Sequence, residues 1–96
     1  MTQEITLLDA HQQWASDAAP TIVDIRDAQS FAQGHIPGSI QLNNDNVAEF
    51  ISNTDGNTHI IVVCYHGISS QQAASVLQQN GLTNTFSMQG GFTAWQ

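Results

Sequence analysis

The chain has 96 residues, a length that suits one domain, which we expect to span residues 1–96. Hydrophobic residues make up 41% of it and no apolar run is long enough to cross a bilayer, so we expect a folded protein without a membrane span. Eight acidic residues stand against one arginine and no lysine, and the net charge of −7 disfavours nucleic acid and anionic membranes as partners.

The single cysteine, Cys64, excludes an internal disulfide and a multi-cysteine metal site. Residues 1–14 have neither the basic region nor the long apolar core of a signal peptide. We therefore expect a cytoplasmic protein in a reducing compartment. The four histidines are scattered without the spacing of a zinc site, and we predict no metal and no other cofactor.

The first quarter of the chain predicts a strand, a helix and a second strand. Residues 5–8 are mostly apolar and β-prone, and Asp9 is placed to cap a helix over residues 10–18. Pro20 ends that helix. The β-branched run at residues 21–25 predicts the second strand, which ends among charged side chains.

The middle of the chain predicts two further helices around a third strand. The helices are short and are separated by turn-forming sequence rich in Gly, Pro, Asn and Asp. In order, we expect a helix at 28–33, a turn at 34–38 and a strand at 39–42. A further helix should have its N-cap within 43–46, carry Val47, Phe50 and Ile51 on one face, and stop near 55–57.

The strand at residues 60–63 consists of four β-branched apolar residues without alternation, which is typical of a strand buried on both faces of a parallel sheet. A helix capped by Ser69 or Ser70 should follow and run to Gly81, with Ala73, Val76 and Leu77 facing inward. We expect a last strand at 85–88, then a turn and a short helix at 90–95. The alternation of strands and helices predicts an α/β fold with a largely parallel sheet covered by helices on both faces.

Cys64 ends the predicted central strand and opens a short loop that leads into a helix. A lone intracellular cysteine is most often a buried, inert small hydrophobe. At this position, however, backbone N–H groups and the positive end of a helix dipole, about +0.5 charge, would stabilise a thiolate. Ligands of parallel sheets bind beyond the carboxyl ends of the strands, so the position of Cys64 supports a nucleophile and an inert core residue about equally.

Two other groups have open roles in the sequence. Arg26 is either an anion binder or one half of a structural ion pair with a nearby carboxylate such as Asp24 or Asp27, and we favour the ion pair. Tyr65 and His66 either orient an acceptor or only shape the mouth of the site. The remaining histidines and the tryptophans are assigned structural roles: His35 as a hydrogen-bonded loop residue, His11 and His59 at the surface, and Trp14 and Trp95 in packing. Gly90–Gly91 is expected to form a turn that allows close backbone approach, and whether it also lines the pocket is open.

Three motifs resemble one known family. VDIRDAQSFAQGHIPGSIQL at 23–42 resembles the N-terminal signature of rhodanese domains, CYHGISS at 64–70 their active-site loop, and GGFTAW at 90–95 their C-terminal motif. The motifs occur in the family's order and at its spacing, and they span most of the chain. The loop and the short length are most similar to the single-domain bacterial thiosulfate sulfurtransferases of the glycerol regulon.

The resemblance implies a five-stranded, mainly parallel sheet and a two-step transfer of sulfane sulfur. Cys64 would attack the outer sulfur of thiosulfate to form a persulfide, which cyanide or a thiol acceptor then discharges. The loop would hold the persulfide through its backbone N–H groups and the Ser69 hydroxyl, and Gly67 would let the backbone curl. The implied site is Cys64 with Tyr65, His66, Gly67, Ile68, Ser69 and Ser70.

The sequence departs from the pattern in its lack of a basic residue around the loop, where Ile68-Ser69-Ser70-Gln71 carries no Lys or Arg. We therefore predict turnover with thiosulfate at a high KM, and a lower KM when Gln71 is replaced by Lys. The alternative is a sulfur carrier or interaction module that receives persulfide from a protein partner. Cysteine phosphatases use Cys-x5-Arg, whereas the sixth residue after Cys64 is Ser70, which removes the main electrostatic contribution to phosphate binding. A catalytically silent domain would be expected to lack the cysteine.

Overall fold

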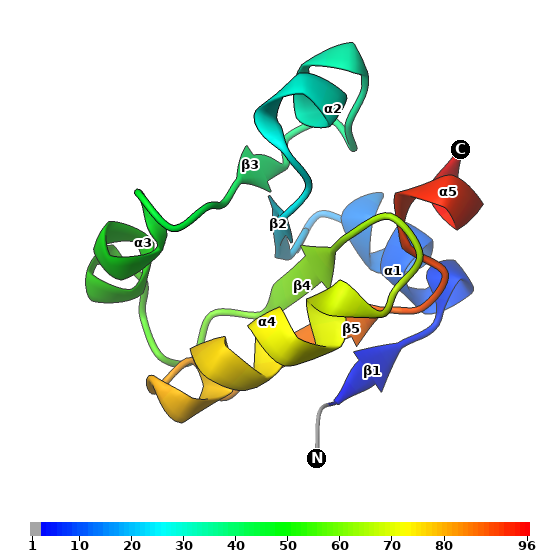
Figure 1. Cartoon of the computed structure of the whole chain (residues 1–96). Coiled ribbons are helices and arrows are strands. Elements are labelled where there is room, and N and C mark those ends of the chain that lie inside the picture. The colour runs from blue at the N-terminus through cyan, green and yellow to red at the C-terminus, as the bar shows by residue number, and fades with distance from the viewer. Residues whose placement is uncertain (1–2) are drawn as a thin grey trace.

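A computed structural model describes residues 3–96 and contains one five-stranded sheet in which all strands are parallel (Figure 1). The α/β fold with helices on both faces of the sheet is confirmed. The strands are β1 (Glu4–Ile5), β2 (Thr21–Asp24), β3 (Ile40–Gln41), β4 (Ile60–Val63) and β5 (Thr85–Met88), and the helices are α1 (Leu7–Trp14), α2 (Ala28–Gln33), α3 (Val47–Asn53), α4 (Ser69–Gln79) and α5 (Gly91–Trp95).

The strand order β1-β5-β4-β2-β3 places β4 in the middle of the sheet. Asp24 at the end of β2 pairs with Val63 at the end of β4, and Val62 pairs with Ser87 on β5. Because the strands are parallel, their carboxyl ends meet at one edge of the sheet. Cys64 follows β4 directly and so lies at the middle of that edge.

The hydrophobic core is divided by the sheet into two layers. Alternate residues of β4 point to opposite faces, so Ile61 and Val63 join the layer under α1 and α5, while Ile60 and Val62 join the layer under α3 and α4. Figure 1 shows α4 on one side of the sheet and α1 on the other. All four β4 side chains have 0% exposure, which confirms the expected strand buried on both faces.

The N-terminal prediction is wrong in its boundaries. The sequence predicts a short strand or a strand end at residues 5–8, and of these residues only Ile5, the end of β1, is in a strand, because α1 already begins at Leu7. The cap of this helix is Thr6 rather than Asp9: the Thr6 Oγ1 accepts a hydrogen bond from the Asp9 N–H at 3.1 Å. The earlier cap starts the helix three residues sooner than the predicted 10–18, and the helix ends at Trp14.

The predicted cap of α4 is also wrong. Ile68 occupies the N-cap position, and neither Ser69 nor Ser70 caps the helix with its side chain. Val76, which we expected to face inward, is 43% exposed, whereas Ala74 and Leu77 are buried. Ser70 is buried within the first turn, and this orientation of α4 turns Val76 toward solvent.

Most other boundaries agree with the sequence. The predicted elements at 28–33, 60–63 and 85–88 are confirmed residue for residue, while β2 and β3 are shorter than expected at their ends. Helix α3 begins at Val47 as the Asn-rich run predicts, and the Asn43 side chain orders that turn by accepting from the N–H groups of Asp45 and Asn46. Within residues 3–96, no helix is long and apolar enough to cross a bilayer.

Candidate active site

The Cys64 thiol is surrounded by hydrogen-bond partners from the residues that follow it. The Gly67 N–H lies 3.1 Å and the Ser70 N–H 3.3 Å from the Cys64 Sγ, and the Ser70 Oγ lies 3.2 Å from the same sulfur. Cys64 is 4% exposed. The loop therefore curls around the sulfur, as the sequence predicts, although it is the Ser70 hydroxyl and not that of Ser69 that contacts the Sγ.

Opposing effects act on the ionisation of Cys64. Burial raises the pKa of the thiol, because a thiolate loses hydration inside the protein. The Ser70 hydroxyl, together with backbone N–H groups of Ser70, Gly67 and His66, lowers the pKa by stabilising the charged form. The hydrogen bonds outweigh the burial, and the pKa of Cys64 lies below its ordinary value. A lowered pKa keeps a larger fraction of a thiol as the thiolate, which is its nucleophilic form.

Glycines make the curled loop possible. Gly67 has φ +85°, and a Cβ at this position would lie 2.8 Å from the backbone nitrogen of Gly90. Gly91 has φ +62°, and its Cβ would lie 2.4 Å from the carbonyl oxygen of Tyr65. Only glycine fits either position without moving the backbone. The close backbone approach that the sequence predicts for Gly90–Gly91 is confirmed, because both glycines pack against the backbone of the Cys64 loop.

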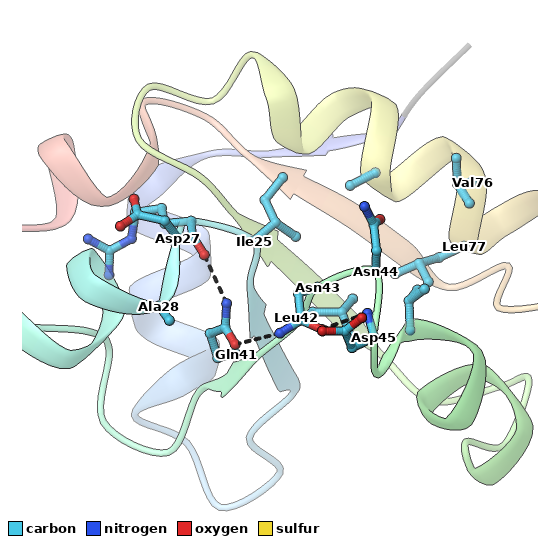
Figure 2. A pocket seen from close by; sticks show the side chains of 13 residues that line it. Ile25, Asp27, Ala28, Gln41, Leu42, Asn43, Asn44, Asp45, Val76 and Leu77 are labelled. Carbon is cyan, nitrogen blue, oxygen red and sulfur yellow. Dashed lines mark hydrogen bonds between the residues drawn. The ribbon is translucent and has the colours of Figure 1, made fainter.

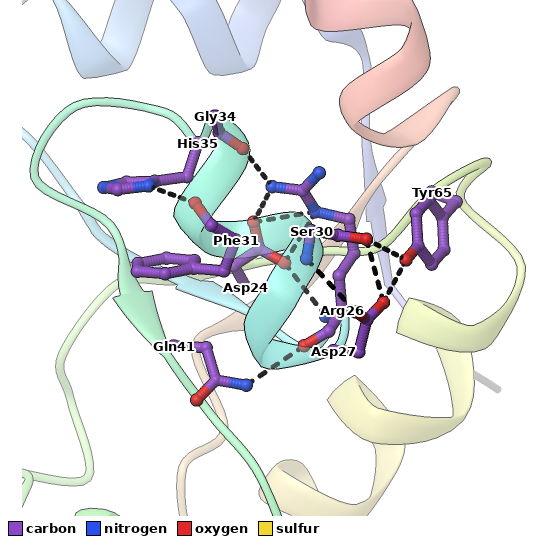
Figure 3. A network of polar contacts seen from close by, with 9 residues as sticks. All are labelled: Asp24, Arg26, Asp27, Ser30, Phe31, Gly34, His35, Gln41 and Tyr65. Atoms are coloured by element: carbon purple, nitrogen blue, oxygen red, sulfur yellow. Dashed lines mark hydrogen bonds and ion pairs between the residues drawn. The ribbon is translucent and has the colours of Figure 1, made fainter.

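Arg26 forms the structural ion pair favoured by the sequence. Its Nη2 lies 2.7 Å from the Asp24 Oδ2, and its Nε donates to both oxygens of the same carboxylate at 3.0 Å (Figure 3). The Nη2 also donates to the Gly34 carbonyl at 2.7 Å, and the guanidinium carbon lies 4.1 Å from the centre of the Phe92 ring. The side chains are 4% and 1% exposed, so this guanidinium is not available to bind an anion.

Tyr65 connects the Cys64 loop to the start of α2. Its hydroxyl hydrogen-bonds the carboxylate of Asp27 and lies 2.5 Å from the Ser30 Oγ (Figure 3). Asp27 also caps α2 by accepting from the Ser30 N–H at 3.1 Å. The Tyr65 hydroxyl, followed by the Ser30 contacts, lowers the pKa of Asp27 from 3.8 to about 2. Tyr65 thus has a definite partner, and its hydroxyl ties the Cys64 loop to the start of α2, while its role toward an acceptor stays a prediction.

Comparison with known proteins assigns the chain to a family. The model of the rhodanese-like domain matches residues 7–96. The chain belongs to the rhodanese family.

Named relatives and a solved structure are similar to this chain over most of its length. The chain is 54% identical to a thiosulfate sulfurtransferase GlpE from Shewanella oneidensis over 74 residues, which are 77% of this chain and 73% of that protein. It is 53% identical to a GlpE from Pseudoalteromonas translucida over 78% of this chain and 71% of that protein. A rhodanese-related protein from Thermoplasma volcanium superposes with a TM-score of 0.82 at 27% identity, covering 97% of this chain and 89% of that one.

The histidines of this rhodanese lie mostly away from Cys64. His35 bonds the Phe31 carbonyl at 2.7 Å through its Nδ1 and stacks on the Phe31 ring, as expected of a structural loop residue. His11 is exposed, whereas His59 is only partly so and contacts the Gln13 side chain at 2.5 Å. His66 is exposed on the loop itself. Among residues 3–96, no group of three or more His, Cys, Asp or Glu side chains is placed to hold a metal ion.

A cavity of about 670 Å³ lies between the start of α2 and the middle of α4 (Figure 2). It is bounded by the loop after β2, the residues between β3 and α3, and the middle of α4. Asp27 stands on its rim and also contacts Tyr65, so the cavity adjoins the mouth of the Cys64 loop. Cys64 is not among the residues that line it.

The sequence missed one residue that the structure brings to the site. Ser87 on β5 is fully buried, and its Oγ lies 2.7 Å from the Ser70 Oγ. Its position 23 residues after Cys64 gave no local indication of this contact. The one available signal was a serine within an otherwise buried strand, since a buried hydroxyl requires a hydrogen-bond partner.

Proposed function

We propose that this rhodanese is a thiosulfate sulfurtransferase whose nucleophile is Cys64. In the first step, the Cys64 thiolate attacks the outer sulfur of thiosulfate, the new S–S bond forms, and the bond to the sulfonate sulfur breaks with release of sulfite. In the second step, cyanide or a thiolate attacks the outer sulfur of the persulfide and restores the Cys64 thiolate. Charge and electrons balance in each step without any cofactor.

The observation that carries the proposal is the set of donors on the Cys64 sulfur. Two backbone N–H groups donate to the sulfur within 3.3 Å, and the Ser70 hydroxyl, which accepts from the neutral thiol at 3.2 Å, is placed to donate to the thiolate once the thiol proton is lost. The same loop, Tyr65 to Ser70, is proposed to surround the outer sulfur of the persulfide. We propose that residues 1–96 act as one domain, and that the protein works in the cytoplasm, where Cys64 stays reduced between turnovers.

The test combines mass measurement with turnover. The protein is incubated with thiosulfate, its intact mass is measured for one added sulfur, and cyanide is then added and thiocyanate is assayed. We expect the adduct and its discharge in the wild type and neither in Cys64→Ser. Thiocyanate formation by Cys64→Ser at the wild-type rate would exclude Cys64 as the nucleophile.

A second candidate function is a carrier that accepts sulfane sulfur from a persulfidated protein partner and passes it on to a thiol of a partner protein. Two observations favour it. Ile68, in the loop that follows Cys64, is 74% exposed and offers apolar surface to a partner. The chain's one arginine is buried in an ion pair and cannot attract a dianion. An adduct formed from a persulfidated protein, but not from millimolar thiosulfate, would identify the carrier as the main function.

A further inference from the structure

A row of three buried polar atoms runs from the nucleophile into the sheet. The Cys64 Sγ lies 3.2 Å from the Ser70 Oγ, which lies 2.7 Å from the Ser87 Oγ. Ser70 and Ser87 are both 0% exposed. The row joins three elements, because Cys64 follows β4, Ser70 lies in the first turn of α4, and Ser87 lies on β5. The buried row links the Cys64 sulfur to Ser87 through the Ser70 hydroxyl.

The protons of the two hydroxyls fix the direction of this row. Each serine has one O–H to donate. Within residues 3–96, the Ser87 Oγ has no side-chain or backbone hydrogen-bond partner other than Ser70. If Ser87 donates to Ser70 and Ser70 donates to the sulfur, both buried protons have acceptors. If instead a Cys64 thiol donates to Ser70 and Ser70 donates to Ser87, the Ser87 proton has none, which is costly in a buried site.

The satisfied direction requires a sulfur that accepts. A thiolate accepts hydrogen bonds and carries no proton, and the Sγ of a persulfide likewise has no hydrogen, because its second bond is to sulfur. The Gly67 and Ser70 N–H groups also donate to this atom. All the neighbouring donors therefore favour the two forms of Cys64 that occur in sulfur transfer.

We propose that Ser87 is a positioning residue for sulfur transfer: by donating to the Ser70 hydroxyl, it holds that hydroxyl as a donor to the Cys64 sulfur. The role of Ser87 in catalysis rests on the proposed function, whereas its effect on the ionisation of Cys64 does not depend on that function. Because Ser87 acts through Ser70, its removal should matter only while the Ser70 hydroxyl is present.

Few other ionisable side chains surround the sulfur, so the contribution of Ser87 is measurable. The elements α4, β5 and α5, which follow or support the loop, carry no acidic, basic or tyrosine side chain. On the loop itself are Tyr65 and His66, both exposed. At the end of β2, Asp24 and Arg26 neutralise each other, and the Asp27 carboxylate at the start of α2 faces the Tyr65 hydroxyl.

The experiment compares two buried hydroxyl deletions on the same strand. Ser87→Ala removes the proposed donor, and the control Thr85→Val removes the equally buried Thr85 hydroxyl, which donates to the Leu82 carbonyl at 2.7 Å and not toward Cys64. The rate of Cys64 alkylation is measured against pH in each protein. We expect the midpoint of Ser87→Ala to rise by about half a pH unit, which is about a threefold loss of thiolate below the midpoint. Thr85→Val should keep the wild-type midpoint.

The Ser70→Ala background tests the route of the effect. Ser70→Ala should raise the midpoint by about one unit, because a hydrogen bond to a charged group is lost, and adding Ser87→Ala should then change nothing more. An unchanged midpoint in Ser87→Ala, or an equal shift with and without the Ser70 hydroxyl, would overturn the proposal. Ser87→Thr, which retains a hydroxyl, should restore the wild-type midpoint.

A measurement on the wild type makes the test independent of whether the variants fold. The hydroxyl proton resonances of Ser70 and Ser87 should both shift as Cys64 ionises, while that of Thr85 stays constant. A constant Ser87 resonance would contradict the proposal. None of these readouts uses a sulfur donor, so a protein without transferase activity that shows the shifts would refute the proposed function and keep the inference about Ser87.

Discussion

The backbone N–H of Phe92 donates a hydrogen bond to the carbonyl oxygen of Cys64, with 2.7 Å between nitrogen and oxygen. Thr93 donates in the same way to the carbonyl of Tyr65 at 3.1 Å. The first residues of α5 therefore bind the backbone carbonyls of the Cys64 loop, while N–H groups of Gly67 and Ser70 bind the Cys64 sulfur. The GGFTAW motif, which begins 26 residues after Cys64 in sequence, directly supports the backbone of the Cys64 loop.

This support predicts a large effect for Gly91→Ala. The new Cβ would lie 2.4 Å from the carbonyl carbon and oxygen of Tyr65 and 2.5 Å from the carbonyl oxygen of Cys64, at a backbone φ of +62°. We expect a loss of about 3 kcal/mol or more in the free energy of unfolding, together with a fall in kcat, because the loop must move away from α5.

The matched control is Gly38→Ala. Gly38 also has a positive φ, +86°, but a Cβ there would meet nothing within 4 Å. The cost should be limited to backbone strain, about 1 kcal/mol, with kcat unchanged. Denaturant unfolding and the thiocyanate assay on both variants check the prediction, and equal losses would show that α5 does not support the loop.

A second prediction concerns the buried ion pair. Arg26→Met leaves the Asp24 carboxylate, which is 1% exposed, without its partner, and we expect a loss of about 3–5 kcal/mol of stability. The double variant Asp24→Leu/Arg26→Met should recover much of that loss, since it removes both charges. If Arg26→Met folds normally and its main change is a raised KM for thiosulfate, Arg26 binds the substrate after all.

A third prediction concerns the pH dependence of Asp27. Above about pH 4 this carboxyl is ionised in both the folded and the unfolded protein, and its contribution to stability is complete. As pH falls toward the folded pKa of about 2, the unfolded chain binds the proton first, so stability is lost across that window.

Tyr65→Phe removes the largest cause of the lowered pKa, so the Asp27 pKa should rise part of the way back toward 3.8, with the Ser30 contacts keeping it below that value. The stability of the variant should then fall less steeply between about pH 4 and pH 2 than that of the wild type. An NMR titration of the Asp27 carboxyl and unfolding curves across this range measure both effects. Identical titration curves in the two proteins would count against the Tyr65 contact.

A fourth prediction concerns the anionic donor. The net charge of −7 and the burial of Arg26 leave no exposed Lys or Arg side chain to attract thiosulfate. Gln71→Lys adds a cation in the first turn of α4 and should lower the KM for thiosulfate several-fold at low ionic strength, with a smaller gain at high salt. The gain must exceed the cost of losing the hydrogen bond that the Gln71 side chain donates to the Gly67 carbonyl at 2.9 Å.

Gln79→Lys is the control for net charge, because it adds the same charge at the exposed end of α4 far from the loop. A KM lowered equally in both variants would mean that overall charge matters rather than a local cation. A KM that is unchanged in Gln71→Lys at low ionic strength would show that capture of the dianion does not limit the reaction.

The sequence predicted the centre of the fold better than its edges. The strand at 60–63 has four apolar β-branched residues in a row, and burial on both faces leaves them no alternative role. At the N-terminus, Thr6 and Asp9 are both good caps, and only the hydrogen bond from the Asp9 N–H to the Thr6 hydroxyl shows which of them starts α1.

The site followed the same division. Cys64 and the curl at Gly67 were predictable because both depend on local sequence, as was the pairing of Arg26 with a neighbouring carboxylate. Contacts between distant segments were not predictable from one sequence, and these include Ser70 with Ser87 and Tyr65 with Asp27. The capping error at α4 has the same origin, since the N–H and hydroxyl of Ser70 both contact the Cys64 sulfur.

The burial of Arg26 also limits the rate at which trypsin cleaves the chain. The sequence has no lysine and one arginine, so the peptide bond after Arg26 is its single cleavage site for that protease. Arg26 is 6% exposed, and its guanidinium is held by Asp24 and by the carbonyl of Gly34. Cutting therefore requires the junction of β2 and α2 to open. The rate at which two fragments appear measures how often this edge of the active site unfolds locally, without any label or substrate.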